Sequence, residues 1–522
     1  MKIISSFLFL ILLFFSQLTT RAQQNLSNGN LFEGEPFLAI NPNNSQNMVV
    51  AWMGTSPTSI AGLTIKVKSS FDGGNTWTAP VLMAHINKNY KSADVSMAFD
   101  KNGKLFICYI DWRESPDSGG VFVAQSSNGG LTFSAPVKAL DVLEDGSKRP
   151  LDRPWLAIDP NGQKLFITTK PAPWIAAPNR PYLTVSTDGG NSWKAWKYLD
   201  NTGYLVGNII AGPMAATCFG GSQTFRAVYP SYLVSQSIYA RYILASSTDD
   251  GNTISYQVVQ SGGTTSKNDS AKLGYQLLIN PSDTNHLAFL YPYGTGGDFD
   301  VYLTESMNAG VTWSTPVKIN DDPVGTPRMQ DMLWGSFDVD GDLLIAWRDR
   351  RGGTNISYNN PSEFYYAYRN HTANTFTANI SLSKQLVPFH AVLEKSGNDF
   401  MSAVLKNDTI NAVWGETRDG SLDIWFVRLL AGNGAITSIS SLNNEAMKAE
   451  VYPNPSKGFF QINLPKIVDS QYRIIDVQGK EIFKSAAVSN QLTIDLLNQN
   501  SGVYFLVIDT EVGKTILKLI KE

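Results

Sequence analysis

The chain has 522 residues, 43% of them hydrophobic and 17% charged, and its formal net charge is −3. This length allows several domains or one large repeat array. Without a basic excess, nothing indicates a nucleic-acid partner, and two cysteines are too few for a disulfide framework. The four histidines lie far apart in the sequence without metal-ligand spacing, so we expect neither a metal site nor another cofactor.

Residues 1–22 are organised like a secretory signal peptide. Lys2 precedes an apolar run from Ile3 to Phe15, and Thr20 and Ala22 place small residues at the −3 and −1 positions. The run is short for a membrane span, and no later segment approaches the length of a transmembrane helix. We expect cleavage before Gln23 and no transmembrane segment in the mature chain. An uncleaved anchor is the alternative.

A short hairpin pattern recurs along the chain. Its first copy, SSFDGGNTWTAP at residues 69–80, joins two β-prone stretches through Asp-Gly-Gly-Asn. Related copies stand at residues 126–136, 186–196, 246–256 and 306–316, with a degenerate copy at 369–379. The pattern thus returns about every 60 residues, which predicts a repeat architecture.

A second repeated element precedes each hairpin. It consists of a short apolar strand, a turn rich in Asn, Asp, Pro and Gly, and a more apolar strand, and it occurs seven times between residues 35 and 418. With the hairpin, each module holds four short strands, the content of one propeller blade. The prediction is therefore an all-β, seven-bladed β-propeller. Six blades are the alternative if one of the last two modules is misread.

The seventh module lacks a fourth strand, because it ends with residues 422–430. A closed ring needs its first and last blades paired, since an open sheet edge invites aggregation. We therefore expect Gln24–Phe32 to supply the missing outer strand of that blade.

The hairpin residues have local structural roles. The aspartates can accept hydrogen bonds from backbone N–H groups of their own turn, the glycines allow positive φ, and the aromatic residue buries a large ring. The pattern Ser-x-Asp-x-Gly-x-Thr-Trp resembles the Asp box of bacterial sialidase-type β-propellers, over about residues 30–430. In that family the box is a structural hairpin away from the active site. The corresponding residues are Ser70, Asp72, Gly74, Trp77, Asp188, Gly190, Trp193 and Trp313.

The C-terminal part has a different pattern. Alternating apolar strands and Asn/Gly turns predict a small β-sandwich. The motifs YPNP (452–455), DVQG (476–479) and SGVY (501–504), in this order, resemble the type A sorting domain of type IX secretion. The resemblance implies export across the outer membrane with the type IX machinery as partner. A carbohydrate-binding sandwich is the alternative. The expected domains are a signal peptide (1–22), a propeller (23–430), a linker (431–445) and a sorting domain (446–522).

Charged residues stand where first strands begin and second strands end. In sialidase-like propellers these positions ring one mouth, so we expect a site for a polar ligand. Arginine forks suit a sugar carboxylate, and paired carboxylates suit acid and base roles. Alternatively, the Asp-x-Arg and Glu-x-Arg units tie adjacent blades through ion pairs. The candidate ligand-binding residues are Glu35, Asp94, Asp152, Arg153, Arg328, Asp331, Arg348 and Arg350.

The resemblance supplies no catalytic residue. The first blade begins FEGEPFLAI, without the Arg-Ile-Pro stretch of true sialidases, and nothing identifies Glu363, Tyr365 and Tyr366 as their Tyr–Glu nucleophile pair. The motif DVDGD (338–342) imitates a calcium loop, but it occupies the turn between first and second strands and lacks the later Glu. We therefore expect a hairpin turn there, not an ion site.

Two function classes stay open. The first is a secreted or cell-surface, sialidase-like enzyme acting on glycans, such as an exo-glycosidase for acidic sugars. A polysaccharide lyase is a weaker variant, because the histidines avoid the predicted mouth. The second class is a non-catalytic surface propeller that binds glycan or protein. We expect a monomer with a glycan or polysaccharide as its ligand.

Overall fold

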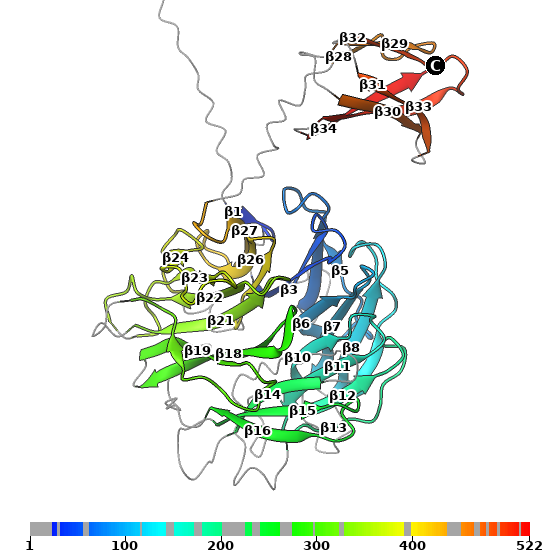
Figure 1. Cartoon of the computed structure of the whole chain (residues 1–522). Coiled ribbons are helices and arrows are strands. Elements are labelled where there is room, and N and C mark those ends of the chain that lie inside the picture. Colours follow the sequence, from blue (N-terminus) through cyan, green and yellow to red (C-terminus); the bar gives the residue numbers. More distant parts are fainter. Residues whose placement is uncertain are drawn as a thin grey trace, which may run out of the picture. The chain divides into compact units, whose positions relative to one another are not determined.

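The computed structural model forms two compact units, Arg21–Ile436 and a C-terminal unit from Thr437 (Figure 1). It describes residues 23–28, 32–55, 62–114, 117–141, 151–171, 180–200, 225–231, 241–260, 274–295, 298–322, 328–355, 357–390, 398–435, 450–463, 470–476, 480–487, 491–510 and 513–522. All named elements among them are β-strands. The predicted signal peptide and residues 436–445 of the predicted linker lie outside the described residues.

Seven antiparallel sheets follow one another along the first unit, and we number them sheet 1 to sheet 7 in chain order. Sheet 1 contains β2 (Glu33–Ile40), β3 (Met48–Thr55), β4 (Leu63–Ser70) and β5 (Val81–Leu82). Sheet 2 contains β6 (Lys91–Phe99), β7 (Leu105–Glu114), β8 (Asp117–Ser126) and β9 (Val137–Asp141). Sheet 3 contains β10 (Leu151–Ile158), β11 (Leu165–Pro171), β12 (Tyr182–Ser186) and β13 (Lys197–Tyr198). Sheet 4 contains β14 (Phe225–Ser231), β15 (Arg241–Ser247) and β16 (Ser255–Gln260).

The remaining sheets continue this order. Sheet 5 contains β17 (Gln276–Asn280), β18 (Asp283–Thr295), β19 (Asp298–Ser306) and β20 (Val317–Lys318). Sheet 6 contains β21 (Gln330–Phe337), β22 (Leu343–Asp349), β23 (Glu363–Arg369) and β24 (Ile380–Ser381). Sheet 7 contains β25 (Ser402–Lys406), β26 (Thr409–Glu416), β27 (Asp423–Leu430) and, from the N-terminal end of the unit, β1 (Gln23–Asn25).

The N-terminal strand completes sheet 7, as predicted. β1 runs antiparallel to β27, with Gln24 opposite Phe426, and Phe32 forms a further bridge with Leu422. The strand is shorter than the predicted segment Gln24–Phe32. Its pairing covers the edge of β27 that would otherwise present unpaired backbone groups.

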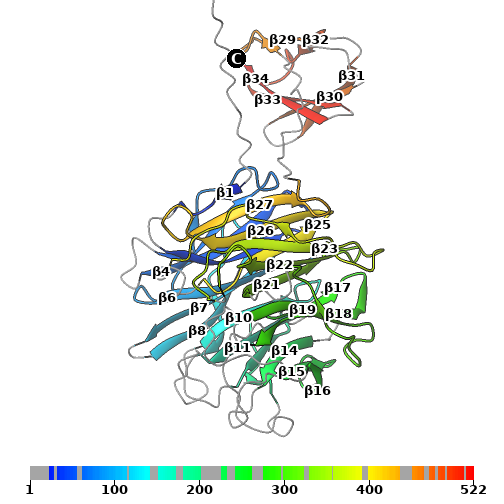
Figure 2. The ribbon, with the colours of Figure 1, turned by 90° about the vertical axis from the view of Figure 1, so that its left-hand side faces the viewer.

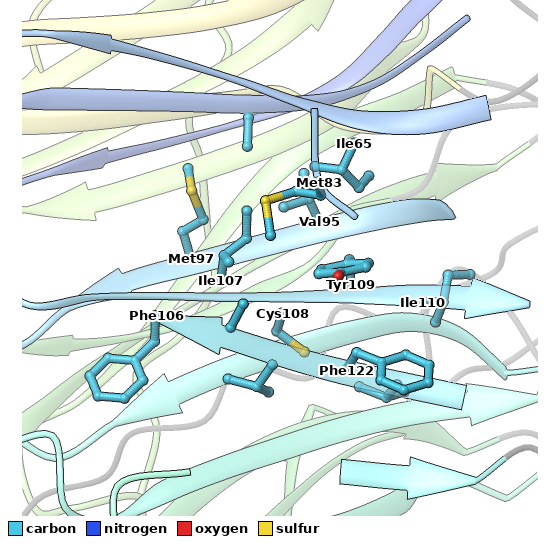
Figure 3. Packing of buried hydrophobic residues seen from close by; sticks show 14 of the residues in the cluster. Ile65, Met83, Val95, Met97, Phe106, Ile107, Cys108, Tyr109, Ile110 and Phe122 are labelled. Carbon is cyan, nitrogen blue, oxygen red and sulfur yellow. The ribbon is translucent and has the colours of Figure 1, made fainter. Parts of the chain in front are cut away.

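Neighbouring sheets pack face to face around a common centre (Figures 1 and 2). The first strand β2 contacts β6 of sheet 2 and β25 of sheet 7. Sheets 3 and 4 meet through the stacked rings of Phe166 and Phe225, 5.3 Å apart. Strands enclosed on both faces are apolar along their whole length. In β7, for example, Phe106 to Tyr109 are all fully buried, on alternating faces (Figure 3).

The predicted hairpin hydrogen bonds are present. Asp72 Oδ1 accepts from the Ser70 hydroxyl at 2.8 Å and from the Thr76 N–H at 2.9 Å. Equivalent contacts recur around Asn128, Asp188, Asp249 and Asn308. Gly74 has φ 89°, and a Cβ there would lie 2.6 Å from the Phe426 ring. A larger residue would therefore clash with sheet 7.

The hairpin lies at the end of sheet 1 opposite the start of its first strand. Ser70 pairs with Met48, whereas Glu33 pairs with Gly54 at the other end. We call the end with the first-strand starts the mouth end.

The C-terminal unit is the predicted β-sandwich. One sheet contains β28 (Glu450–Tyr452), β29 (Phe459–Asn463) and β32 (Gln491–Asp495). The other contains β31 (Glu481–Ala487), β30 (Ser470–Asp476), β33 (Gly502–Thr510) and β34 (Gly513–Lys521). The two sheets share one core, which includes Phe460 and Ile494 from the first and Ile474 and Leu506 from the second.

Trp77→Ala should lower the free energy of unfolding by about 2–4 kcal/mol, because the half-buried ring packs edge-to-face on Phe426 at 5.2 Å. Urea unfolding followed by circular dichroism measures the change. Leu131→Ala, at a side chain 42% exposed in the second hairpin, is the control and should change stability by less than about 0.5 kcal/mol. Equal effects of the two variants would contradict the structural role of the ring.

Candidate functional site

The first strands of four sheets share a β-bulge at the mouth end. The pairing register shifts at Gly34/Phe37, Ala93/Ser96, Asp152/Trp155 and Asp331/Trp334. Within each bulge one non-glycine residue has positive φ: Glu35 (56°), Asp94 (54°), Arg153 (51°) and Met332 (54°). Bulges re-aim side chains, and such strained backbone concentrates at functional sites. Three of the four residues carry ionisable groups.

These three residues belong to one group of charges, which we call the carboxylate cluster: Glu35, Asp94, Asp152, Arg153, Lys170 and Asp399. The Arg153 guanidinium pairs with Asp399, and the Arg153 N–H donates to Asp94 Oδ2 at 2.9 Å. Lys170 pairs with Asp152, its cross-strand neighbour. Asp94 is also hydrogen-bonded to the side chains of Glu35 and Asp152. Sheets 1, 2, 3 and 7 therefore all contribute to the cluster.

The pKa values of neighbouring carboxyl groups in the cluster are shifted in opposite directions. Burial raises the pKa of Asp94 well above its usual value, and the nearby Glu35 and Asp152 raise it further. Burial also raises the pKa of Glu35, with Asp399 adding to the effect. Burial acts the same way on Asp152, but Lys170 and Arg153 outweigh it and lower the pKa of that carboxyl. Asp94 thus binds its proton more tightly than Asp152 does.

An aromatic layer lies next to the cluster. Phe37, Trp155 and Trp334 each stand two residues after a bulge residue, and Phe400 follows Asp399. Trp155 lies 6.1 Å from Phe37, 5.8 Å from Trp334 and 5.5 Å from Phe400, between ring centroids. These rings come from sheets 1, 3, 6 and 7, so the first strands of these sheets converge.

Arg348, Arg350 and Asp331 form a separate, buried group, with exposed fractions of 2%, 1% and 0%. Arg348 Nε and Nη2 donate to the two Asp331 oxygens at 2.8 Å each, and Arg350 Nη2 donates to Asp331 Oδ2 at 3.2 Å. Burial raises the pKa of Asp331, but the two arginines outweigh it and hold the pKa below its usual value. These three residues, predicted to bind a ligand, therefore pair with one another in the interior.

Arg328 hydrogen-bonds to residues outside the cluster. Its N–H donates to Asp298 Oδ1 at 2.8 Å, and its Nε donates to the Gly353 carbonyl at 3.1 Å. Of the eight predicted ligand-binding residues, the cluster brings together Glu35, Asp94, Asp152 and Arg153.

The expectation that the histidines avoid the mouth is wrong for His85. Its Nδ1 lies 2.8 Å from Asp111 Oδ1, at the second-strand end of sheet 2. Ser92 Oγ donates to the same Asp111 oxygen at 2.9 Å and lies 3.0 Å from the same His85 nitrogen. A serine activated by histidine would need the other ring nitrogen, so this is not a nucleophile–base relay. The equivalent Asp349 likewise accepts from the indole of Trp347.

The sialidase-type Tyr–Glu pair is not assembled at the cluster. Tyr365 OH donates to Glu363 Oε2 at 3.4 Å, but both residues lie on β23, the third strand of sheet 6. The Arg351 guanidinium lies 4.2 Å from the centre of the Tyr365 ring.

The DVDGD segment forms the predicted turn between β21 and β22. His371 Nδ1 lies 2.6 Å from Asp342 Oδ1 and 3.9 Å from Asp340 Oδ2, a spacing compatible with metal ligands. The Asp342 carboxylate also accepts from the His371 N–H and the Tyr368 hydroxyl. Its oxygens therefore already have donors from the protein.

Lys170 is a cluster residue absent from the predicted set, whereas Asp399 belongs to the charged first-strand starts that were predicted to ring the mouth. Lys170 stands near the end of the second strand of sheet 3, where it pairs with the aspartate before the first-strand bulge as Arg348 does in sheet 6. Asp399 follows the pattern of a first-strand start. The alignment of modules therefore contained a signal for both.

Comparison with known proteins decides the nature of the tail. Residues 450–522 match the family described as the secretion system C-terminal sorting domain. The C-terminal unit is a type IX sorting domain. The protein is therefore exported to the cell surface or secreted. Within the described residues, no helix is long and apolar enough to cross a membrane.

The structural neighbours of the chain include propeller glycosidases. A Hadza microbial sialidase, Hz136, is 12% identical with a TM-score of 0.40, covering 78% of this chain and 66% of that one. The phage phi92 endosialidase is 11% identical with a TM-score of 0.42, covering 95% and 87%. The GH93 α-L-arabinofuranosidase of Fusarium graminearum is 13% identical with a TM-score of 0.39, covering 77% and 95%. At these identities and TM-scores, the similarity does not indicate an activity for this chain. No curated protein matches the chain.

Arg348→Ala should lower the free energy of unfolding by about 3 kcal/mol, because a buried Asp331 loses its bidentate partner. Urea unfolding measures the loss. Lys138→Ala, which removes an exposed partner of Asp141, should change stability by less than about 1 kcal/mol. An Arg348→Ala protein of unchanged stability would show that the arginine is not a structural tie.

Deletion of residues 446–522 should leave the first unit folded but retained in the periplasm, because the sorting domain directs passage of the outer membrane. Cell fractionation and protease accessibility in a host with type IX secretion measure this. Appearance of the truncated protein on the surface would contradict the role of the tail.

Proposed function

We propose that the first unit is a seven-bladed, sialidase-like β-propeller that acts on a glycan outside the cell, with the carboxylate cluster as its site. The seven successive sheets, the convergence of their first strands and the export signal support this proposal. The cluster stands at the mouth end, opposite the hairpins, where the sequence pattern predicted the ligand.

The observation that carries the proposal is the hydrogen-bonded series Glu35–Asp94–Asp152. Titratable neighbours whose environments drive their pKa values apart mark acid and base roles. Asp94 keeps its proton and would give it to the glycosidic oxygen as the C–O bond breaks. Water would add its hydroxyl to the anomeric carbon and pass its remaining proton to an ionised carboxylate.

The geometry narrows the choice of the second carboxylate. In glycosidases, the general acid and the second carboxylate stand about 5–9.5 Å apart. Asp94 and Asp152 are closer than this, because their side chains are hydrogen-bonded to each other. Asp152 therefore positions Asp94, the proposed general acid. Asp399 is the candidate for the carboxylate that accepts the proton of the water. Its side chain is 20% exposed, and Arg153 orients it.

The non-catalytic alternative also has an observation in its favour. The Arg153–Asp399 pair joins sheet 3 to sheet 7, so it acts as a tie between blades. Asp399 would have to be released from this pair to accept a proton. A binding propeller needs no such opening.

Asp94→Asn should reduce glycan cleavage at least about 100-fold while binding persists, because the amide cannot supply the proton. Wild-type cleavage should also fall as pH rises through the raised pKa of Asp94. Reducing-sugar release from a panel of oligosaccharides and calorimetric binding to the same panel measure the two effects.

The matched control is Asp188→Asn. It makes the same chemical change in a hairpin at the opposite end of the sheets, where Asn128 and Asn308 already occupy the equivalent position. Cleavage should be unaffected. Binding by the wild-type protein without any cleavage would favour the non-catalytic alternative.

A further inference from the structure

We infer that the carboxylate cluster recognises its glycan through groups that donate hydrogen bonds, sugar hydroxyls or a sugar ammonium, and that it disfavours acidic sugars. The inference rests on the proposed function for the location of the ligand. It does not require that the glycan be cleaved.

An unused acceptor lies within the cluster. Glu35 is only 2% exposed. Its side chain shares a hydrogen bond with the Asp94 carboxyl, but its Oε2 finds no N–H or hydroxyl donor among the described residues. A buried polar atom without a partner is costly, and such atoms in folded proteins call for an explanation. An ionised carboxyl group only accepts hydrogen bonds, so a donor that reaches Oε2 would also lower the raised pKa of Glu35.

The charge balance of the cluster favours the same ligands. Four carboxyl groups, those of Glu35, Asp94, Asp152 and Asp399, surround the cations of Arg153 and Lys170. Even with protons on both Asp94 and Glu35, whose pKa values are raised, the carboxylates of Asp152 and Asp399 offset the two cations. A sugar carboxylate would therefore find no unpaired cation in the cluster, whereas hydroxyls and ammonium groups could donate to its carboxyl oxygens.

The cations of the cluster are already engaged. Lys170 is 3% exposed and pairs with Asp152, and the side chain of Arg153 is 12% exposed and pairs with Asp399. Arg348 and Arg350, the fork expected for an acidic sugar, hold Asp331 in the interior of sheet 6. Arg153, Arg348 and Arg350 are therefore all engaged by carboxylates of the protein.

Asp152 and Asp399 are the more exposed carboxyl groups of the cluster. The Asp152 and Asp399 side chains are 18% and 20% exposed, whereas Glu35 and Asp94 are 2% and 8% exposed. A sugar would thus meet Asp399 and Asp152 first and place one donor deeper, toward Glu35.

An oligosaccharide array probed with the full mature protein tests the inference. The array holds matched sets: polygalacturonate with galactan, sialylated with desialylated glycans, and chitosan oligomers as the ammonium arm. We expect binding to neutral or amino sugars at least 10-fold tighter than to each acidic counterpart. Preferential binding of the acidic members, or binding of no glycan, would overturn the inference.

Two variants locate the binding. Glu35→Gln should weaken binding of an amino sugar about 10-fold or more and of a neutral sugar less, because charged hydrogen bonds are the stronger ones. Asp399→Asn, at a more exposed position, should weaken both sugars if the first variant fails to fold. Asp188→Asn should leave binding unchanged. Unaltered affinity in both cluster variants, with intact melting temperatures, would overturn the inference.

The outcomes separate this inference from the proposed cleavage. Neutral or amino sugars that bind without being cleaved leave the inference standing and exclude the hydrolase. Cleavage confined to acidic sugars supports the hydrolase and overturns the inference.

Discussion

Pairing of β1 with β27 is the contact on which the arrangement of the first unit depends. It joins the first described strand of this unit to its last sheet, so that sheet 7 lies against sheet 1. The Leu38 N–H donates to Ser402 Oγ across this boundary at 3.2 Å. Because Glu35 and Asp399 stand on either side of it, the boundary also brings the two carboxyl groups into one electrostatic group.

Strain and charge are concentrated at the same backbone positions. A non-glycine residue in the left-handed region costs about 1 kcal/mol or more, and Glu35, Asp94 and Arg153 all adopt it. The hydrogen bond from the Arg153 backbone to Asp94 shows what offsets this cost. The same bulges that strain the backbone therefore turn ionisable side chains toward one another.

Burial separates the two kinds of arginine in this protein. Arg348 and Arg153 look alike in the sequence, since each stands beside an aspartate near a strand end. The first forms a bidentate pair within its own sheet, and the second reaches across to another sheet. Asp331, which pairs with Arg348, and Asp94, which accepts from the Arg153 backbone N–H, respond oppositely to pH. Asp331, with a lowered pKa, loses its stabilising contribution as pH falls below the ordinary aspartate range. Asp94, with a raised pKa, contributes most at low pH and less as pH rises.

The sequence by itself determined the features that are local in the chain. The hairpins were predictable because each turn is held by contacts among neighbours such as Ser70, Asp72 and Thr76. The strand content, the strand added to sheet 7 and the sorting domain followed from the period of the pattern and from motif order. Four of the eight predicted ligand-binding residues belong to the cluster, because first-strand starts meet at one end.

Only the tertiary structure decided the state of each charge. The burial of Arg348, the pairing of Arg153 with Asp399 and the raised pKa of Asp94 depend on which side chains the fold brings together. Lys170 was missed because its partner Asp152 becomes its neighbour only in the cross-strand register. The prediction that His85 lies away from the mouth was wrong, because the segment before β6 brings His85 next to Asp111 near the end of β7. Desolvation and pairing act through space, and the distances that control them arise only when the sheets assemble.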